Sequence, residues 1–334
     1  MPTVAVLGAG SWGTALAVHL AGIGHRVRLW GRDPELVERM EARRVNDVYL
    51  ADVPIPDSVL VTNALAAALD DAALVVSAIP SHGCRGVMRG AARLLTPRAV
   101  IVSATKGLEA GSMLRMSEVV AQEAGVDHPV VVLSGPSFAV EVARQLPTAI
   151  LAASLDAWAI EHVQEEFRGP HFRLYGSDDV IGVEIGGALK NIIAIAAGVV
   201  EGLGLGHNAL AALITRGLAE LTRIACAAGG RRETLSGLSG LGDLVLTCTG
   251  DLSRNRRVGL ELARGRSLAE ILAGTKMVAE GVITTGVALE LGERYGVELP
   301  IATQMGEVLS GRCDVRTAIS ALMLRRQRAE AETG

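Results

Sequence analysis

A glycine-rich segment near the N-terminus constrains the fold more than any other feature of the chain. Gly8, Gly10 and Gly13 form a GxGxxG pattern that directly follows the apolar run 3–7 and opens an apolar helical pattern. A strand, a tight glycine turn and a helix in this order are typical of a dinucleotide-binding fold, because the turn lets a pyrophosphate reach the backbone amides at the helix N-terminus. The alternative is a glycine turn with a purely structural role.

Short apolar runs in the first half of the chain have the length of β-strands and alternate with helical patterns. Runs such as 74–76 and 130–133 are apolar without alternation, as expected for parallel strands that helices cover on both faces. We therefore predict a doubly wound parallel sheet. Its expected strands are residues 3–7, 26–30, 59–62, 73–79, 99–103, 130–133 and 148–152.

The pattern changes after Asp178 and Asp179. No further strand-like run follows, and long helical patterns such as 183–200 and 210–228 take over. The predicted fold class is therefore α/β plus all-α. We expect a Rossmann-like dinucleotide-binding domain over residues 1–178 and a helical substrate and catalytic domain over residues 179–334.

Composition and charge argue against several classes of protein. The formal net charge of −4 does not provide the basic surface that a nucleic acid or an anionic membrane would need. Residues 1–25 carry no Lys, Arg, Asp or Glu, but glycines interrupt them where a membrane helix would be continuous, so we expect no membrane insertion. The cysteines lie far apart without clustered histidines, which predicts no metal site and the free thiols of a cytoplasmic protein.

The end of the second expected strand bears on the choice of cofactor. Asp33 stands where a ribose-binding carboxylate is usual, but Pro34 follows it, so Asp33 fits better as a helix N-cap. Arg32 then remains at the strand end, and its guanidinium suits a 2′-phosphate. We therefore predict that NADP(H) is favoured and that NAD(H) use stays open. The alternative for Arg32 is an ordinary surface cation.

Two loops that follow expected strands carry polar groups. Lys106 comes after the run 99–103, and Gly135 and Ser137 come after the run 130–133. Because ligands of doubly wound folds bind at the carboxyl ends of the strands, we expect both loops to face that crevice.

Lys190 is the only charged residue between Ile185 and Val200, in a helical pattern made almost entirely of apolar residues. A lysine in such surroundings either extends its ammonium to the surface or serves a chemical function. The first alternative is the more common one for an isolated lysine. The second would make Lys190 a candidate general acid and base.

Two segments further along the chain add a carboxylate and several cations. Asp243 lies in an apolar stretch and is expected to pair with Lys190, unless it only caps a helix. Arg254 offers the planar fork that fits a substrate phosphate. Its neighbours Arg256 and Arg257 are predicted to be solvated cations of a basic turn.

Together these motifs resemble those of the NAD(P)-dependent glycerol-3-phosphate dehydrogenases of the bacterial, soluble type. The resemblance runs from GAGSWGTALA at Gly8 through SATKG, SGPSFA, ALKNIIAIAAG, LSGLGDLVLTCTG, SRNR and VAEGVITT to Thr285. It implies hydride transfer between NAD(P)H and dihydroxyacetone phosphate, which gives sn-glycerol 3-phosphate for phospholipid synthesis. It also implies a homodimer.

The resemblance further assigns roles to residues of this sequence. Lys190 would exchange the proton at the C2 oxygen of the substrate, supported by Lys106 and Asp243. The substrate site would comprise Lys106, Gly135, Ser137, Lys190, Asp243, Ser253, Arg254 and Asn255. The cofactor site would comprise Gly8, Gly10, Ser11, Trp12, Gly13, Arg32, Lys106, Ala139, Arg254, Val278 and Glu280, of which Val278 and Glu280 are implied by the resemblance alone.

Two other functions are weighed against this one. A β-hydroxyacid dehydrogenase would share both domains and the helical lysine, but such enzymes tend to have an Asn four residues beyond that lysine, where this chain has Ala194 and instead has Asn191. A protein that only senses NADP(H) would keep the fold without the chemistry. It would not need both lysines, Asp243 and Arg254.

Overall fold

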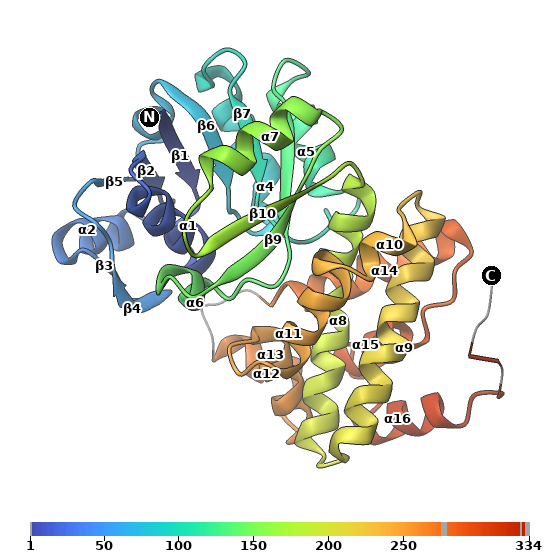
Figure 1. Cartoon of the computed structure of the whole chain (residues 1–334). Coiled ribbons are helices and arrows are strands. Elements are labelled where there is room, and N and C mark those ends of the chain that lie inside the picture. Colours follow the sequence, from blue (N-terminus) through green and yellow to red (C-terminus); the bar gives the residue numbers. More distant parts are fainter. Residues whose placement is uncertain (1, 275–278, 328, 331–334) are drawn as a thin grey trace. The chain divides into compact units, whose positions relative to one another are not determined.

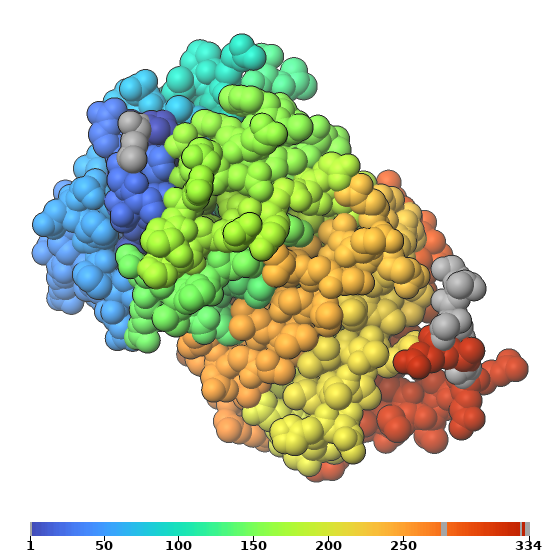
Figure 2. Space-filling view, viewed as in Figure 1, coloured from blue at the N-terminus to red at the C-terminus, as the bar shows by residue number. Residues whose placement is uncertain are grey.

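The chain forms two compact units in the computed structural model, which describes residues 2–274, 279–327 and 329–330. Unit 1 comprises Met1–Glu109 and Leu114–Glu184, and unit 2 comprises Ala110–Met113 and Ile185–Gly334. In the space-filling view the colours run from blue to green over most of unit 1 and from yellow-green to red over most of unit 2 (Figure 2). The division falls within helix α8 (Val180–Gly202), shortly after the domain limit expected from the sequence.

Unit 1 is built on one eight-stranded sheet with the strand order β10-β9-β8-β7-β6-β1-β2-β5 (Figure 1). Neighbouring strands are parallel, except that β8 and β9 are antiparallel. The order reverses between β1 and β6, so the carboxyl ends of these two strands form the topological switch point of the doubly wound fold. The strands are β1 Thr3–Leu7, β2 Arg26–Trp30, β5 Val59–Thr62, β6 Ala72–Ser77, β7 Val100–Ser103, β8 Val130–Ser134, β9 Thr148–Ala153 and β10 Phe172–Ser177.

Alternate residues of β1 enter two different apolar cores. Val4 and Val6 pack with residues of α1 and α7, whereas Ala5 and Leu7 pack with residues of α4 and α5. Because helices cover both faces of the sheet, both sets of side chains are buried, which explains strands without polar alternation. The helices of unit 1 are α1 Ser11–Gly22, α2 Pro34–Arg43, α3 Leu65–Leu69, α4 Ser81–Ala91, α5 Met116–Ala124, α6 Ala139–Ala143 and α7 Ala157–Glu166, with a 3-10 turn at Ala92–Leu94.

Three strands, and the direction of a fourth strand, were not predicted from the sequence. Strands β3 (Val45–Asn46) and β4 (Leu50–Pro54) pair with each other in a small antiparallel sheet. Edge strand β10 buries Phe172 and Leu174 but exposes Arg173, an alternation that suits a strand with one open face. The reversed direction of β9 was also not predicted, because an apolar run does not specify the direction of its neighbour.

Unit 2 is helical, as predicted, and its described residues contain no strand (Figure 1). The helices after α8 are α9 Gly206–Ala227, α10 Arg232–Leu235, α11 Asp243–Thr249, α12 Arg254–Ala263, α13 Leu268–Ala273, α14 Glu280–Tyr295, α15 Pro300–Leu309 and α16 Val315–Met323, with a π-helical turn at Leu238–Gly242. Within the described parts of the chain, α8 alone is long and apolar enough to cross a membrane, but 89% of its apolar window is buried inside the structure. Such burial is usual for the core helix of a folded domain.

Helices α8 and α12 approach each other backbone to backbone. A Cβ atom added at Gly198 would lie 1.9 Å from the carbonyl oxygen of Arg256, and one at Gly259 would lie 1.9 Å from that of Ile195. Only glycine permits so close an approach. These two glycines therefore fix α12 against the helix that carries Lys190.

Candidate active site

The glycine-rich loop after β1 uses its three glycines in different ways. Gly8 has a φ of +118°, and a Cβ there would lie 2.5 Å from the Ala78 carbonyl oxygen. A Cβ at Gly13 would lie 1.9 Å from the Gly8 carbonyl oxygen, so Gly13 lets α1 pack closely onto the loop. A Cβ at Gly10 would meet no protein atom within 4 Å. Protein packing does not require glycine at that position, which fits a ligand that approaches the backbone.

The first turn of α1 offers hydrogen-bond donors. Its N-cap is Gly10, which has no side chain to accept from the first amides, and no acidic residue follows in the turn. The indole Nε1 of Trp12 in the same turn is buried and has no hydrogen-bond partner among the described residues. Buried donors are normally paired. Together with Ser11, these groups fit the pyrophosphate and adjoining parts of a dinucleotide.

Asn46 of β3 holds the glycine-rich loop, a role that the sequence did not reveal. Its fully buried Nδ2 donates to the Ala9 carbonyl at 2.9 Å and to the Thr14 hydroxyl at 2.8 Å, and its Oδ1 accepts from the Tyr49 amide at 3.1 Å. No local pattern around Asn46 signals these contacts, because β3 is only two residues long.

The end of β2 agrees with the expected arrangement of Arg32 and Asp33. The Asp33 carboxylate accepts from the amides of Glu35 and Leu36 at 3.1 and 3.4 Å, and Pro34 is the first residue of α2. Asp33 is therefore the predicted N-cap. The Arg32 side chain beside it is exposed.

The loops after β7 and β8, which were expected to face the same crevice, are in contact because the two strands are parallel neighbours. The Lys106 ammonium donates to the Gly135 carbonyl at 3.1 Å, and the Ser137 hydroxyl donates to the same oxygen at 3.0 Å. Gly135 has a φ of +142°, and a Cβ there would lie 2.9 Å from the Ile150 Cα, so this position requires glycine. Ala139 begins α6 immediately after this loop.

Lys190 is buried, with 5% of its surface exposed, so the alternative in which it extends to the surface is wrong. Its ammonium forms an ion pair with Asp243, as predicted, and donates to the Thr247 hydroxyl at 2.7 Å. Thr247 in turn donates to the Asp243 carbonyl at 2.6 Å. Thr247 was not among the residues predicted from the sequence. Its i,i+4 spacing from Asp243 is the signal that places both on one helix face.

The glycine-rich stretch Leu238–Gly242 before Asp243 forms a π-helical turn. A Cβ at Gly240 would lie 2.0 Å from the Leu235 carbonyl oxygen, and one at Gly186 of α8 would lie 3.1 Å from the Ser239 carbonyl oxygen. The turn thus packs closely on α8 and presents Asp243 to Lys190. Such π-helical turns are frequent at functional sites.

The start of α12 carries three predicted residues with different exposures. The Ser253 hydroxyl caps the helix by accepting from the Arg256 amide at 3.2 Å, and Ser253 and Asn255 are buried. Arg254 between them is exposed. Of the three, Arg254 therefore has the side chain that is accessible to an anion.

Asn255 links helices α8, α12 and α14. Its Nδ2 donates to the Asn191 side-chain oxygen at 2.9 Å, and its Oδ1 accepts from the Gly281 amide at 3.0 Å. This network fixes the start of α14, where Glu280 lies within electrostatic reach of the Arg254 guanidinium. Val278, the other residue implied for this segment, lies outside the described residues.

Arg256 does not behave as the solvated cation that was predicted. It is 9% exposed, and its guanidinium forms ion pairs with Glu201 at 2.6 Å and with Asp251 at 3.1 Å. The interpretation failed because the paired carboxylate on α8 is remote in sequence. Arg257 is exposed, as predicted.

The residues present thus fit a dinucleotide at the glycine-rich loop, and nothing in the described parts of the chain suggests a metal centre. No group of three or more His, Cys, Asp or Glu residues there is arranged to hold a metal ion. The donors of the first turn of α1 and the open backbone at Gly10 are the features that support the dinucleotide.

Comparisons with known proteins cover nearly the whole chain. The family model for the N-terminus of NAD-dependent glycerol-3-phosphate dehydrogenase matches residues 3–159, and the model for the C-terminus matches residues 179–320. A glycerol-3-phosphate dehydrogenase, NAD(P)+, of Thioalkalivibrio sulfidiphilus is 56% identical over 280 residues, which are 84% of each chain. Its counterpart of Geobacter sulfurreducens is 51% identical over 284 residues, again 84% of each chain.

Solved structures show the same similarity. A glycerol-3-phosphate dehydrogenase of Coxiella burnetii matches with a TM-score of 0.93 and 42% identity, covering 97% of this chain and 99% of that one. The enzyme of Saccharomyces cerevisiae matches with a TM-score of 0.79 and 26% identity, covering 96% and 99%. A D-mandelate dehydrogenase, with a TM-score of 0.60 and 12% identity over 93% and 98% of the two chains, shares the fold alone.

Proposed function

This chain belongs to the family of NAD-dependent glycerol-3-phosphate dehydrogenases. On this basis we propose which of its residues carry out the chemical step and which bind the substrate and the cofactor. The chain is an oxidoreductase that interconverts dihydroxyacetone phosphate and sn-glycerol 3-phosphate with NAD(P)H, and it supplies glycerol 3-phosphate for glycerophospholipid synthesis. The assignment of the chemical step rests on the buried ion pair between Asp243 of α11 and Lys190, which is the only charged residue in the stretch 185–200 of α8.

Lys190 acts as general acid and base at the C2 oxygen of the substrate. In the reductive direction its ammonium gives a proton to the developing alkoxide, and in the oxidative direction the amine takes that proton back. Asp243 and Thr247 orient the ammonium through hydrogen bonds. Lys106 adds positive charge near the oxygen, and a preorganised donor of this kind contributes on the order of 10²-fold in rate.

The phosphate of the substrate is assigned to Arg254. Arg254 is an exposed residue in the first turn of α12, although burial around its guanidinium lowers its pKa, and the helix dipole there also favours an anion. Ser253 and Asn255 hold this turn through the cap and the link to α8, and they line the same substrate site. The loop after β8 adds Gly135 and Ser137 to the substrate contacts.

The nicotinamide supplies or accepts the hydride at C2 when the cofactor is bound. Arg32 favours NADP(H) over NAD(H), because Asp33 is already engaged as a helix cap and leaves the exposed guanidinium to bind a 2′-phosphate. The residues assigned to the cofactor are Gly8, Gly10, Ser11, Trp12, Gly13, Arg32, Lys106, Ala139, Arg254, Val278 and Glu280.

The setting proposed for the enzyme is the cytoplasm, where it acts on a small phosphorylated substrate as a homodimer, without nucleic acid and without membrane insertion. The net charge of −4 and the four free thiols support this setting. The dimer is supported by the family resemblance.

A single assay tests substrate and cofactor together. Purified protein is mixed with NADPH and dihydroxyacetone phosphate, and oxidation of the cofactor is followed by absorbance, with dihydroxyacetone and NADH in parallel reactions. We expect oxidation with the phosphorylated ketone, little with the bare ketone, and a higher kcat/KM with NADPH. Absence of oxidation with either ketone would indicate a protein that only binds NADP(H).

The variant Arg254→Ala tests the phosphate-binding role of Arg254 in the same assay. Loss of a charge-assisted contact of about 2 to 3 kcal/mol should raise the KM for dihydroxyacetone phosphate by roughly 30- to 150-fold. Arg257→Ala is the matched control, since Arg257 is an exposed cation of the same helix. An unchanged KM in the Arg254 variant would refute phosphate binding by this residue.

A further inference from the structure

The loop that carries Lys106 is a short hairpin with a closed base. Between β7 and α5, Leu108 forms an antiparallel bridge with Arg115, and the Glu109 amide donates to the Leu114 carbonyl at 2.9 Å. Leu108 is 1% exposed and anchors the base in the apolar core. Because Lys106 stands just before this base, whatever fixes the base also fixes the backbone of Lys106.

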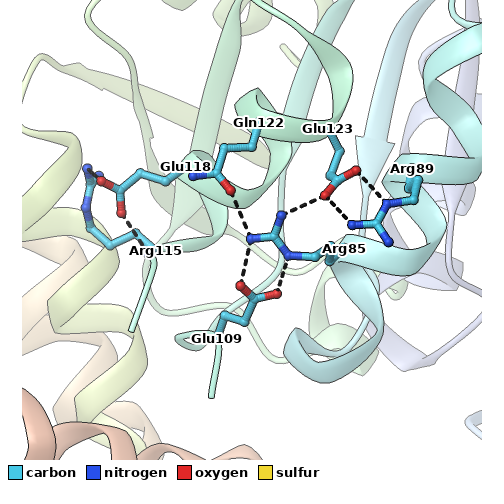
Figure 3. Close-up of polar contacts among 7 residues, drawn as sticks. All are labelled: Arg85, Arg89, Glu109, Arg115, Glu118, Gln122 and Glu123. Atoms are coloured by element: carbon cyan, nitrogen blue, oxygen red, sulfur yellow. Dashed lines mark hydrogen bonds and ion pairs between the residues drawn. The ribbon is translucent and has the colours of Figure 1, made fainter. Parts of the chain in front are cut away.

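Arg85 of helix α4 forms an ion pair with Glu109 in the first arm of the hairpin. Arg85 donates from Nε and Nη2 to the two carboxylate oxygens of Glu109 at 2.8 and 2.7 Å, in the bidentate geometry (Figure 3). Its Nη1 donates to Glu123 of α5 at 2.6 Å. One guanidinium therefore joins α4, α5 and the Lys106 hairpin. The side chains of Arg85 and Glu109 are 26% and 17% exposed, so this pair is partly shielded from solvent, unlike an ordinary surface pair.

The charges of this network persist across the neutral pH range. Hydrogen bonds from Arg89 and Arg85 lower the pKa of Glu123 to about 2. Hydrogen bonds to Glu109 and Glu123 raise the pKa of Arg85 above its ordinary value. Both shifts favour the charged forms of Arg85 and Glu123 at neutral pH.

A carboxylate of unit 1 holds the second arm. Arg115 donates to Glu184 at 2.8 Å, and the amide and hydroxyl of Ser117 donate to the same carboxylate at 2.8 and 2.5 Å. The tip of the hairpin, Ala110–Met113, belongs to unit 2. The two ion pairs therefore stand at the places where the chain leaves unit 1 and returns to it.

We propose that Arg85 and Glu109 are positioning residues for Lys106. Their bidentate pair fixes the base of the hairpin and so holds the Lys106 ammonium at the Gly135 carbonyl, 3.1 Å away, although neither residue is assigned a contact with substrate or cofactor. This inference rests on the role in substrate and cofactor binding proposed above for Lys106.

Two isosteric variants separate positioning from general stabilisation. Glu109→Gln and Glu123→Gln each remove one carboxylate partner of Arg85, but only Glu109 belongs to the hairpin. We expect Glu109→Gln to lower kcat/KM for dihydroxyacetone phosphate by about tenfold, because small displacements of a catalytic group are costly. Glu123→Gln should stay within about twofold of the wild type, with a comparable change in Tm. Equal kinetic effects in the two variants, or none in Glu109→Gln, would overturn the inference.

Variants of Arg85 test whether the two residues act through each other. Arg85→Ala and the double variant Arg85→Ala, Glu109→Ala should lose the same kcat/KM, since removal of either partner already frees the hairpin. Arg85→Lys keeps the charge but not the fork, so its kcat/KM should fall between wild type and Arg85→Ala. If the double variant lost more kcat/KM than Arg85→Ala, so that the losses from the two substitutions multiplied, the two residues would not act through each other.

The variant Lys106→Ala distinguishes a failure of this inference from a failure of the function proposed for Lys106. If Lys106→Ala keeps wild-type kcat/KM, the role assigned to Lys106 is wrong. If Lys106→Ala is impaired while Glu109→Gln is not, the role of Lys106 stands and the positioning role of Glu109 is rejected.

Discussion

Lys190 brings a charge into the apolar stretch 185–200 of α8, and Asp243 and Thr247 balance and orient it. If Lys190 transfers the proton at C2, Lys190→Ala should lower kcat by about 10²-fold or more. NADPH affinity should stay nearly intact, because the residues assigned to the cofactor do not include Lys190. Stopped-flow turnover and a fluorescence titration with NADPH measure the two quantities. A variant with undiminished kcat would remove Lys190 from the mechanism.

The same substitution leaves Asp243 as an unpaired carboxylate in a buried position, where loss of one partner costs about 3 to 5 kcal/mol. Lower activity in Lys190→Ala would then be ambiguous if the variant were also unstable. The double variant Lys190→Met, Asp243→Leu removes both charges and keeps similar volumes. It should fold, as judged by its thermal transition, and still lack turnover. Recovery of turnover in the double variant would show that stability, not chemistry, explains the single variant.

At the scale of secondary-structure elements, the contact of α8 with α12 determines where the turn that we propose to bind the phosphate lies. Gly259→Ala would place a Cβ 1.9 Å from the Ile195 carbonyl oxygen, so the two helices must separate. We expect the free energy of unfolding to fall by about 2 kcal/mol or more. The KM for dihydroxyacetone phosphate should also rise, because Arg254 moves with α12.

Gly286→Ala provides the matched control for Gly259→Ala. Gly286 lies within α14, and a Cβ there would meet no atom within 4 Å. Because alanine favours a helix more than glycine does, this variant should gain about 0.5 to 1 kcal/mol of stability and keep the wild-type KM. Urea unfolding of both variants gives the comparison. Equal stability changes would mean that the close approach of α8 and α12 is not what requires glycine.

For the whole molecule, local patterns predicted most of the framework. Apolar runs located the central strands, the Asp-Pro pair located a helix cap, and the lone Lys190 and Asp243 were identified before they were seen to meet. Apart from the pair of Lys190 and Asp243, contacts between distant segments were not predicted from the sequence. Asn46 with the glycine loop and Arg256 with Glu201 join residues whose neighbours in sequence give no sign of the partner. The amphipathic edge strand β10 was missed because it lacks the continuous apolar run of its neighbours.

The global stability of the fold also depends on a carboxylate that has no part in the proposed chemistry. Glu220 of α9 is buried and accepts from the amides of Ile301 and Ala302, both at 2.9 Å, at the N-terminus of α15. Desolvation raises its pKa from the ordinary value of 4.5 to about 7, against the lowering effect of these two hydrogen bonds. In the folded state Glu220 therefore keeps its proton at pH values where the unfolded chain has lost it.

The sign of the resulting pH dependence follows from this raised pKa. The contribution of Glu220 to stability is fully present below about pH 4.5 and is lost as the pH rises through about 7. Relative to Glu220→Gln, which cannot titrate, the wild type should therefore lose about 3 kcal/mol of unfolding free energy between these limits. Urea titrations at several pH values measure this difference, and the exposed Glu290 in a Glu290→Gln variant is the control. If the difference between wild type and Glu220→Gln stays constant with pH, the carboxylate is ionised in the folded state and the helix amides outweigh its burial.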